Sequence, residues 1–155
     1  MKKFHSVLFT ATLLFVAQLS IGQSNVNANA DHVALGGYDV VAYHNVYDAV
    51  RGNNEFAATH RDATYYFSSA ENQKAFQESP SKYLPEYGGY CAFAMAMKGA
   101  KVPTDPHTFK IRDGKLYLFF NDYYEGKPFN TIIPWNGSEQ EMIGKANANW
   151  ATVGK

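Results

Sequence analysis

Cys91 is the residue of this chain with the widest choice of chemistry. It is the only cysteine in 155 residues, and it lies in the stretch YGGYCAFAMAM, which runs from Tyr87 to Met97. A cysteine can serve as a nucleophile, as a ligand for a soft metal ion, or as a small buried apolar residue. Because a single cysteine cannot form an internal disulfide, its thiol calls for one of these three explanations.

Soft-metal binding, with copper first, is the leading hypothesis for this thiol. Cu(I) prefers thiolate, thioether and imidazole ligands. If residues 90–97 are helical, Cys91 and Met95 lie at i and i+4 on one face. His107 precedes a predicted hairpin and His44 ends a predicted strand, so either would supply an imidazole. The predicted metal ligands are therefore Cys91, Met95, His107 and His44, although no paired-cysteine or paired-histidine spacing supports them.

A reactive thiol and a ligand-binding module are the alternatives. A helix beginning at Gly88 and Gly89 would place Cys91 in its first turn, where unpaired backbone amides favour a thiolate. A redox cycle would need a second thiol from another molecule, and no nucleophile-elbow motif supports a Cys–His hydrolytic pair. We therefore expect no catalytic residues. In the binding-module alternative, with Cys91 structural or redox-active, aromatic side chains would line an apolar pocket: Tyr38, Tyr43, Tyr87, Tyr90, Phe93 and Trp135.

The N-terminus predicts export. Lys2 and Lys3 precede an apolar run at residues 7–17, which is short for a membrane span and is followed by the small residues Ser20 and Gly22. We expect residues 1–22 to be a cleaved signal peptide, with an uncleaved anchor as the alternative. The protein would then be periplasmic or secreted, without stable membrane insertion. Residues 23–33 are polar and are expected to form a disordered lead-in.

The charge balance argues against nucleic acid as a partner. The chain has 14 Lys and Arg against 14 Asp and Glu, and loss of the signal peptide would leave a slight acidic excess. Nucleic-acid binding requires a concentrated basic surface, which this composition does not indicate. The expected partner is a metal ion or a small molecule, and the oligomeric state is left open.

The order of the predicted strands and helices indicates an α+β fold, a small antiparallel sheet with short helices packed against it. We expect it to form a single domain at residues 34–155. Strands are predicted at residues 38–44, 56–60 and 64–67, and Asp113-Gly114 is typical of a type I′ hairpin turn. A capping box at residues 68–71 begins a helix that is predicted to run to about Glu78. Further helices are predicted from Ser79-Pro80 towards Tyr83 and at 90–97. A second capping box, at residues 138–141, begins a C-terminal amphipathic helix with Met142, Ile143, Ala146 and Trp150 on its apolar side. Residues 122–135 carry no clear pattern.

Three segments carry a resemblance to a known family: GGYDVVAYH, ATYYFSSAENQKAFQESPSKYLPEYGGYCAFA and DGKLYLFFN. With the C-terminal ANANW, they resemble the YHS-domain family, and more closely its exported stand-alone branch, over residues 34–150. The resemblance implies metal binding, possibly of copper, because YHS domains occur in copper-transporting ATPases. Metal-associated members resemble a pattern with three cysteines, and Ala42, Ser68 and Asn72 stand at those positions here. Their ligands therefore do not carry over, and Cys91 is the thiol that this branch has instead.

Overall fold

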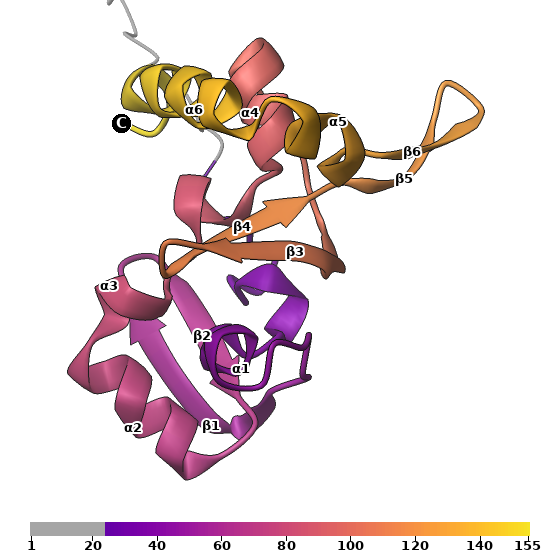
Figure 1. Cartoon of the computed structure of the whole chain (residues 1–155). Helices are drawn as coiled ribbons and strands as arrows, with labels where there is room; N and C mark the ends of the chain where they lie inside the picture. Colours follow the sequence, from indigo (N-terminus) through magenta and orange to yellow (C-terminus); the bar gives the residue numbers. More distant parts are fainter. Residues whose placement is uncertain (1–23) are drawn as a thin grey trace, which may run out of the picture.

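The structure is a computed structural model that describes residues 24–155, so the predicted signal peptide lies outside the described residues. The described chain forms two stacked halves, the earlier elements below and the later ones above in Figure 1. The lower half contains α1 (Val40–Asn45), β1 (Asn53–His60), β2 (Ala63–Phe67), α2 (Ala70–Glu78) and α3 (Pro80–Tyr83). The upper half contains α4 (Ala92–Lys98), β3 (Asp105–Arg112), β4 (Lys115–Phe119), β5 (Asn121–Tyr124), β6 (Lys127–Asn130), α5 (Ile132–Gly137) and α6 (Glu139–Val153).

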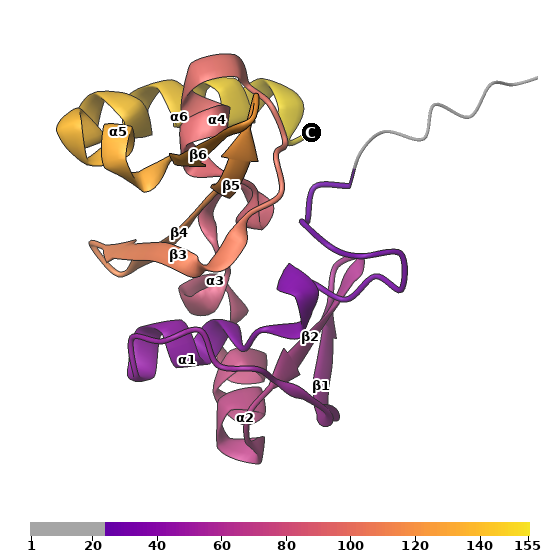
Figure 2. The same ribbon diagram turned by 90° about the vertical axis from the view of Figure 1, so that its right-hand side faces the viewer.

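The predicted α+β class is confirmed, with three small sheets in place of one. The sheets are the antiparallel pairs β1–β2, β3–β4 and β5–β6. The β5–β6 hairpin projects from the upper half (Figure 1), whereas α4 and α6 lie together at the top of both views (Figure 2). No helix within residues 24–155 combines the length and apolar character needed to cross a bilayer.

Strand β4 connects the two halves because both of its faces are buried. Successive side chains of a strand point to opposite faces. Leu116 and Leu118 therefore join the first core, which lies in the lower half, whereas Tyr117 and Phe119 join the second core above. The first core also contains Val40, Val41, Tyr43, Tyr65, Phe67, Phe76 and Tyr83. The second core also contains Tyr87, Ala92, Met95, Ala96, Trp135 and Ala146.

The predicted strand at residues 38–44 is wrong, because most of it forms helix α1. Asp39 Oδ1 accepts hydrogen bonds from the backbone amides of Val41 (2.8 Å) and Ala42 (3.2 Å). An aspartate in this N-cap position satisfies amides that a helix start leaves unpaired. The cap and burial of the helix in the first core outweigh the strand preference of the two valines.

Helix α2 begins one residue later than the predicted capping box implied. Ser69, not Ser68, is the N-cap, and its hydroxyl accepts from the Asn72 amide at 3.2 Å. Ser68 instead directs its amide and hydroxyl to Asp39 Oδ2, at 2.8 and 2.7 Å. Ser68, which the sequence pattern placed at the N-cap, is therefore hydrogen-bonded to the buried carboxylate of Asp39 instead.

Several other predicted elements are confirmed. The β3–β4 hairpin turns at Asp113 and Gly114, whose φ values of 51° and 73° are those of a type I′ turn. The strands at 56–60 and 64–67 form β1 and β2, and α3 starts at Pro80. The predicted apolar side of α6 packs on the second core through Met142, Ile143, Ala146 and Trp150.

The described part of the predicted disordered lead-in lies against the domain and is hydrogen-bonded to it. We call residues 24–35 the N-terminal strap. The Asn27 amide donates to the Gly88 carbonyl at 2.9 Å, and the Tyr90 hydroxyl lies 2.9 Å from the Ser24 carbonyl oxygen and 3.1 Å from that of Val26. The expectation of disorder is corrected for these residues, because these hydrogen bonds and the burial of Val33, Ala34 and Leu35 hold the strap against the domain.

Candidate functional site

The thiol of Cys91 is fully buried at the start of α4. Cys91 is the N-cap residue, and its Sγ lies 3.5 Å from the Ala94 amide nitrogen and 3.3 Å from that of Phe120. Its own amide donates to the Val102 carbonyl at 2.9 Å. The sulfur is therefore held between α4 and the end of β4 by two backbone donors.

Thr131 is the polar side chain beside this sulfur. Its Oγ1 lies 3.3 Å from Cys91 Sγ and donates to the Phe120 carbonyl at 2.9 Å. Because the threonine hydrogen is engaged there, the thiol hydrogen is the one left to join the two side chains. Sequence reasoning missed Thr131, which is buried but lies in the stretch 122–135 where no pattern pointed to a site.

A pocket of about 140 Å³ opens over Cys91 and Thr131. Helix α4 supplies one wall and the β5–β6 hairpin the other. The hairpin contacts the helix through Phe93 and Phe129, whose ring centroids are 6.1 Å apart, and Tyr124 lies 6.1 Å from Phe129. Most of the lining is apolar: Cys91, Phe93, Ala94, Met97, Lys98, Val102, Phe120, Tyr124, Phe129 and Thr131.

Met95 does not lie in this pocket. Its side chain is fully buried in the second core, which also contains Trp135. Cys91 and Met95 do not share one helical face, because Cys91 is the N-cap residue, lies outside the regular helix and has non-helical backbone angles. Met97, not Met95, is the methionine that lines the same pocket as Cys91.

His107 lies elsewhere, on the exposed side of an irregular stretch of β3. Its Nε2 is 3.3 Å from the Tyr38 hydroxyl, and the two rings meet edge to face at 5.5 Å. Asp105 accepts from the His107 amide and the Thr108 hydroxyl, at 3.0 and 2.6 Å. Burial raises the pKa of Asp105, but these and further hydrogen bonds outweigh burial and lower the pKa overall.

His44 lies in a third place, at the end of α1 against Tyr83, with ring centroids 5.5 Å apart. Its Nε2 is buried and has no hydrogen-bond partner among the described residues. Burial, and secondarily the positive charge of Lys82, lowers the pKa of His44. The lowered pKa favours the neutral imidazole, which packs against Tyr83 in the lower half.

The four predicted metal ligands thus have separate surroundings. Among residues 24–155, no group of three or more His, Cys, Asp or Glu side chains is arranged to hold a metal ion. The predicted aromatic pocket is also dispersed, because only Phe93 of that set lines the Cys91 pocket. The other members lie in the cores, under the N-terminal strap or on the surface: Tyr38, Tyr43, Tyr87, Tyr90 and Trp135.

The three positions that resemble metal-ligand positions come together around Asp39. The Ala42 amide donates to Asp39 Oδ1, and the Ser68 hydroxyl and Asn72 Nδ2 donate to Oδ2, the latter at 2.7 Å. These groups are hydrogen-bond donors occupied by a buried carboxylate, and they include no thiolate, thioether or imidazole. The residues do not fit a soft metal ion at this place.

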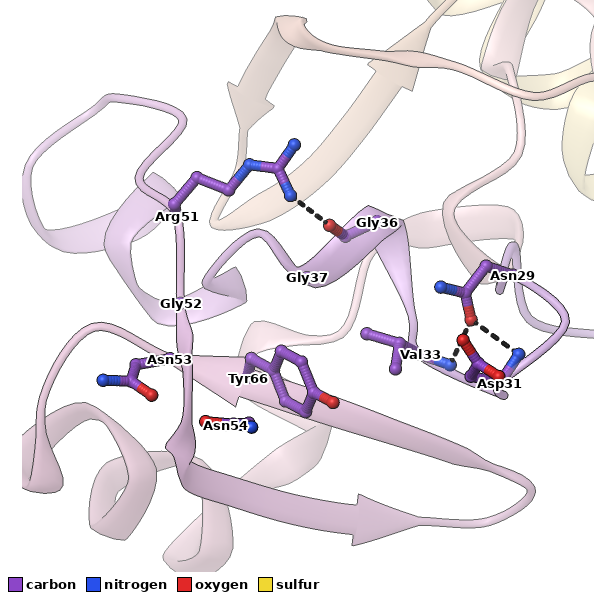
Figure 3. Close-up of a pocket in the computed structure, with 10 residues that line it drawn as sticks. All are labelled: Asn29, Asp31, Val33, Gly36, Gly37, Arg51, Gly52, Asn53, Asn54 and Tyr66. Atoms are coloured by element: carbon purple, nitrogen blue, oxygen red, sulfur yellow. Dashed lines mark hydrogen bonds between the residues drawn. The ribbon is translucent and has the colours of Figure 1, made fainter.

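A polar cleft of about 740 Å³ lies in the lower half (Figure 3). Arg51 stands at one end, where its guanidinium donates to the Gly36 carbonyl at 2.8 Å and stacks 4.5 Å from the Tyr38 ring. Asn29 and Asp31 stand at the other end (Figure 3). The Arg51 guanidinium and the Asn29 carboxamide oxygen are both hydrogen-bonded to backbone groups, and so they stabilise the loops around the cleft.

Comparison of the chain with models of protein families, with curated proteins and with solved structures finds no match. The function is therefore inferred from the geometry of the site. The resemblance to YHS domains stays a prediction.

Proposed function

We propose that this protein is a binding module that holds a small apolar molecule in the pocket over Cys91. The observation that supports it is the composition of the pocket wall. Phe93, Met97, Phe120, Tyr124 and Phe129 converge from α4, the end of β4 and the β5–β6 hairpin on one space. A concave apolar space with a few polar groups at fixed positions is the usual form of a small-molecule site.

The buried polar pair at the base gives the thiol a structural role in this proposal. Cys91 Sγ and Thr131 Oγ1 are hydrogen-bonded to each other and to the backbone of Phe120. A ligand therefore does not need to form hydrogen bonds with the base of the pocket. The energy of binding would come chiefly from removing the ligand and the aromatic walls from water. The proposal is thus the binding-module alternative, with a different set of wall residues.

A ligand-observed NMR screen of small aromatic and aliphatic compounds tests the proposal. The matched variant is Ala94→Leu, which fills the pocket while keeping the backbone amide that faces Cys91. Ala148→Leu, at an exposed position of α6, is the control. We expect compounds that bind the wild type and Ala148→Leu but not Ala94→Leu. Absence of binding to all three proteins, or equal binding to all three, contradicts the proposal.

Soft-metal binding is the second candidate. Its support is that two sulfur-containing side chains, Cys91 and Met97, line the same pocket. A Cu(I) competition titration against a calibrated chelator, on the wild type and Cys91→Ala, tests it. One-to-one binding that weakens about 100-fold in the variant, as expected for loss of a ligand, supports copper. No binding above the chelator's threshold removes it.

We also propose export to the periplasm or the medium, from the N-terminal sequence. The measurement is N-terminal sequencing of the protein recovered outside the cytoplasm. A mature chain that begins near Gln23 supports a cleaved signal peptide. Recovery of the uncleaved chain in the membrane fraction would favour the anchor alternative.

A further inference from the structure

The lining of the Cys91 pocket contains one charged residue, and it is a cation. Lys98 is the last residue of α4, and its Nζ lies 5.8 Å from the centroid of the Tyr124 ring. The lysine is exposed, and no ion pair between described residues involves it. A positive charge therefore stands beside an apolar space, and within residues 24–155 no carboxylate forms an ion pair with it.

The volume limits what can occupy the apolar space. A cavity of about 150 Å³ with apolar walls is large enough to hold one benzene molecule. The pocket over Cys91, at about 140 Å³, is of that size. It suits a single six-membered ring or a short alkyl chain, whereas a long acyl chain or a fused ring system would extend into water.

The distribution of polarity then sets the orientation of the ligand. At the base, the Thr131 hydroxyl and the Cys91 thiol are engaged with the protein. At the edge, Lys98 offers three N–H donors and a charge. A ligand therefore gains most by directing its apolar body towards Cys91 and an anionic group towards Lys98.

We propose that the ligand of this pocket is a small carboxylic acid with a single-ring or short-chain body, ionised at neutral pH; this proposal rests on the proposed function. The carboxylate pairs with Lys98, and the body fills the space between α4 and the β5–β6 hairpin. A pair at a solvent-exposed edge contributes modestly, and a few-fold gain in affinity is typical. The gain should decrease as salt concentration rises.

The test compares benzoate with benzamide, its neutral counterpart of nearly equal shape, by NMR titration of the purified protein. We expect benzoate to bind roughly 3- to 10-fold more tightly than benzamide at low salt. Lys98→Met should abolish this preference without weakening benzamide. Lys127→Met removes an exposed charge from the β5–β6 hairpin, at a position outside the pocket lining, and should preserve the preference for benzoate.

The outcomes separate this inference from the proposed function. Equal affinity for benzoate and benzamide, or a preference that persists in Lys98→Met, overturns the carboxylate proposal and leaves the pocket as a site for neutral molecules. If neither compound binds and the wider screen finds no ligand that Ala94→Leu excludes, both proposals are overturned.

Discussion

At the scale of single residues, two buried polar groups organise this protein. Cys91 Sγ accepts hydrogen bonds from two backbone amides and contacts Thr131, and so fixes the end of β4 against α4. Asp39 accepts from α1 and from Ser68 and Asn72, and so fixes α1 against the start of α2. The sequence marked Cys91 as unusual because it is the lone cysteine. It gave no reason to select Asp39 or Thr131, because their roles depend on partners distant in the chain.

Asp39→Asn should be strongly destabilising. The amide nitrogen of asparagine cannot accept a hydrogen bond, so it would leave buried donors of α1 or Ser68 unpaired. We expect a loss of about 3 kcal/mol in the free energy of unfolding, measured by urea denaturation. Asp48→Asn, an exposed control, should change stability by less than about 0.5 kcal/mol. A loss at Asp39 no larger than that of the control would contradict this role.

His44 should make stability depend on pH. Burial lowers its pKa in the folded state below the ordinary value of 6.5, so the unfolded chain binds this proton more readily. Its stabilising contribution is complete above pH 6.5 and is lost as the pH falls from there towards the folded pKa. The slope is at most about 1.4 kcal/mol per pH unit.

Urea denaturation between pH 7.5 and 5 measures this slope. His44→Gln removes the titrating group and should flatten the curve. An unchanged slope in His44→Gln would contradict the assignment.

At the scale of elements, local patterns predicted the parts whose signals are local. The Asp113-Gly114 turn, the Pro80 helix start and the apolar side of α6 need only neighbouring residues, and each is where the sequence indicated. The 38–44 segment failed because a capping aspartate and burial outweigh two valines. The β5–β6 hairpin was missed, although it turns at Glu125-Gly126, because its strands are exposed and lack apolar alternation.

The N-terminal strap should depend on Gly88. This glycine has a φ of +64°, and a Cβ added to it would overlap the backbone carbonyl of Asn25. Gly88→Ala should therefore release the strap and lower the free energy of unfolding by more than about 1 kcal/mol. Hydrogen exchange of the Asn27 amide, which donates to Gly88, should accelerate markedly.

Gly144→Ala is the matched control for that experiment. Gly144 lies in α6, and an added Cβ meets nothing within 4 Å. Alanine there should stabilise the protein by about 0.5–1 kcal/mol and leave exchange of the strap unchanged. If Gly88→Ala behaves like this control, the strap is not held in the way described.

At the scale of the whole molecule, the two halves should unfold as one unit. Leu118 and Phe119 are neighbours on β4 that serve opposite cores. Leu118→Ala and Phe119→Ala should each cost about 2–5 kcal/mol, because each leaves a cavity in a fully buried core. Because β4 belongs to both cores, far-UV circular dichroism and the fluorescence of Trp135 and Trp150, which both belong to the second core, should report one coincident transition for each variant. Separate transitions would contradict a single cooperative unit.

The architecture also explains why the Cys91 pocket could not be predicted from the sequence. The pocket is formed where α4, the end of β4 and the projecting hairpin meet (Figure 1), and its wall residues extend from Phe93 to Thr131. No short motif unites them. The sequence supplied the central residue, Cys91, and one wall, Phe93, and the fold supplied the others.

Alkylation of Cys91 by N-ethylmaleimide, followed by mass spectrometry, is the most direct test of the central claim that this pocket binds a small molecule. The thiol is the only one in the chain and is fully buried at the base of the pocket. N-ethylmaleimide therefore reaches it only when the pocket wall opens, and a ligand bound in the pocket opposes that opening. With a bound ligand from the screen at ten times its dissociation constant, mass action predicts a rate about 11-fold slower. Alkylation of Ala94→Leu should be insensitive to the same ligand. A wild-type rate that the ligand does not change would contradict binding over Cys91.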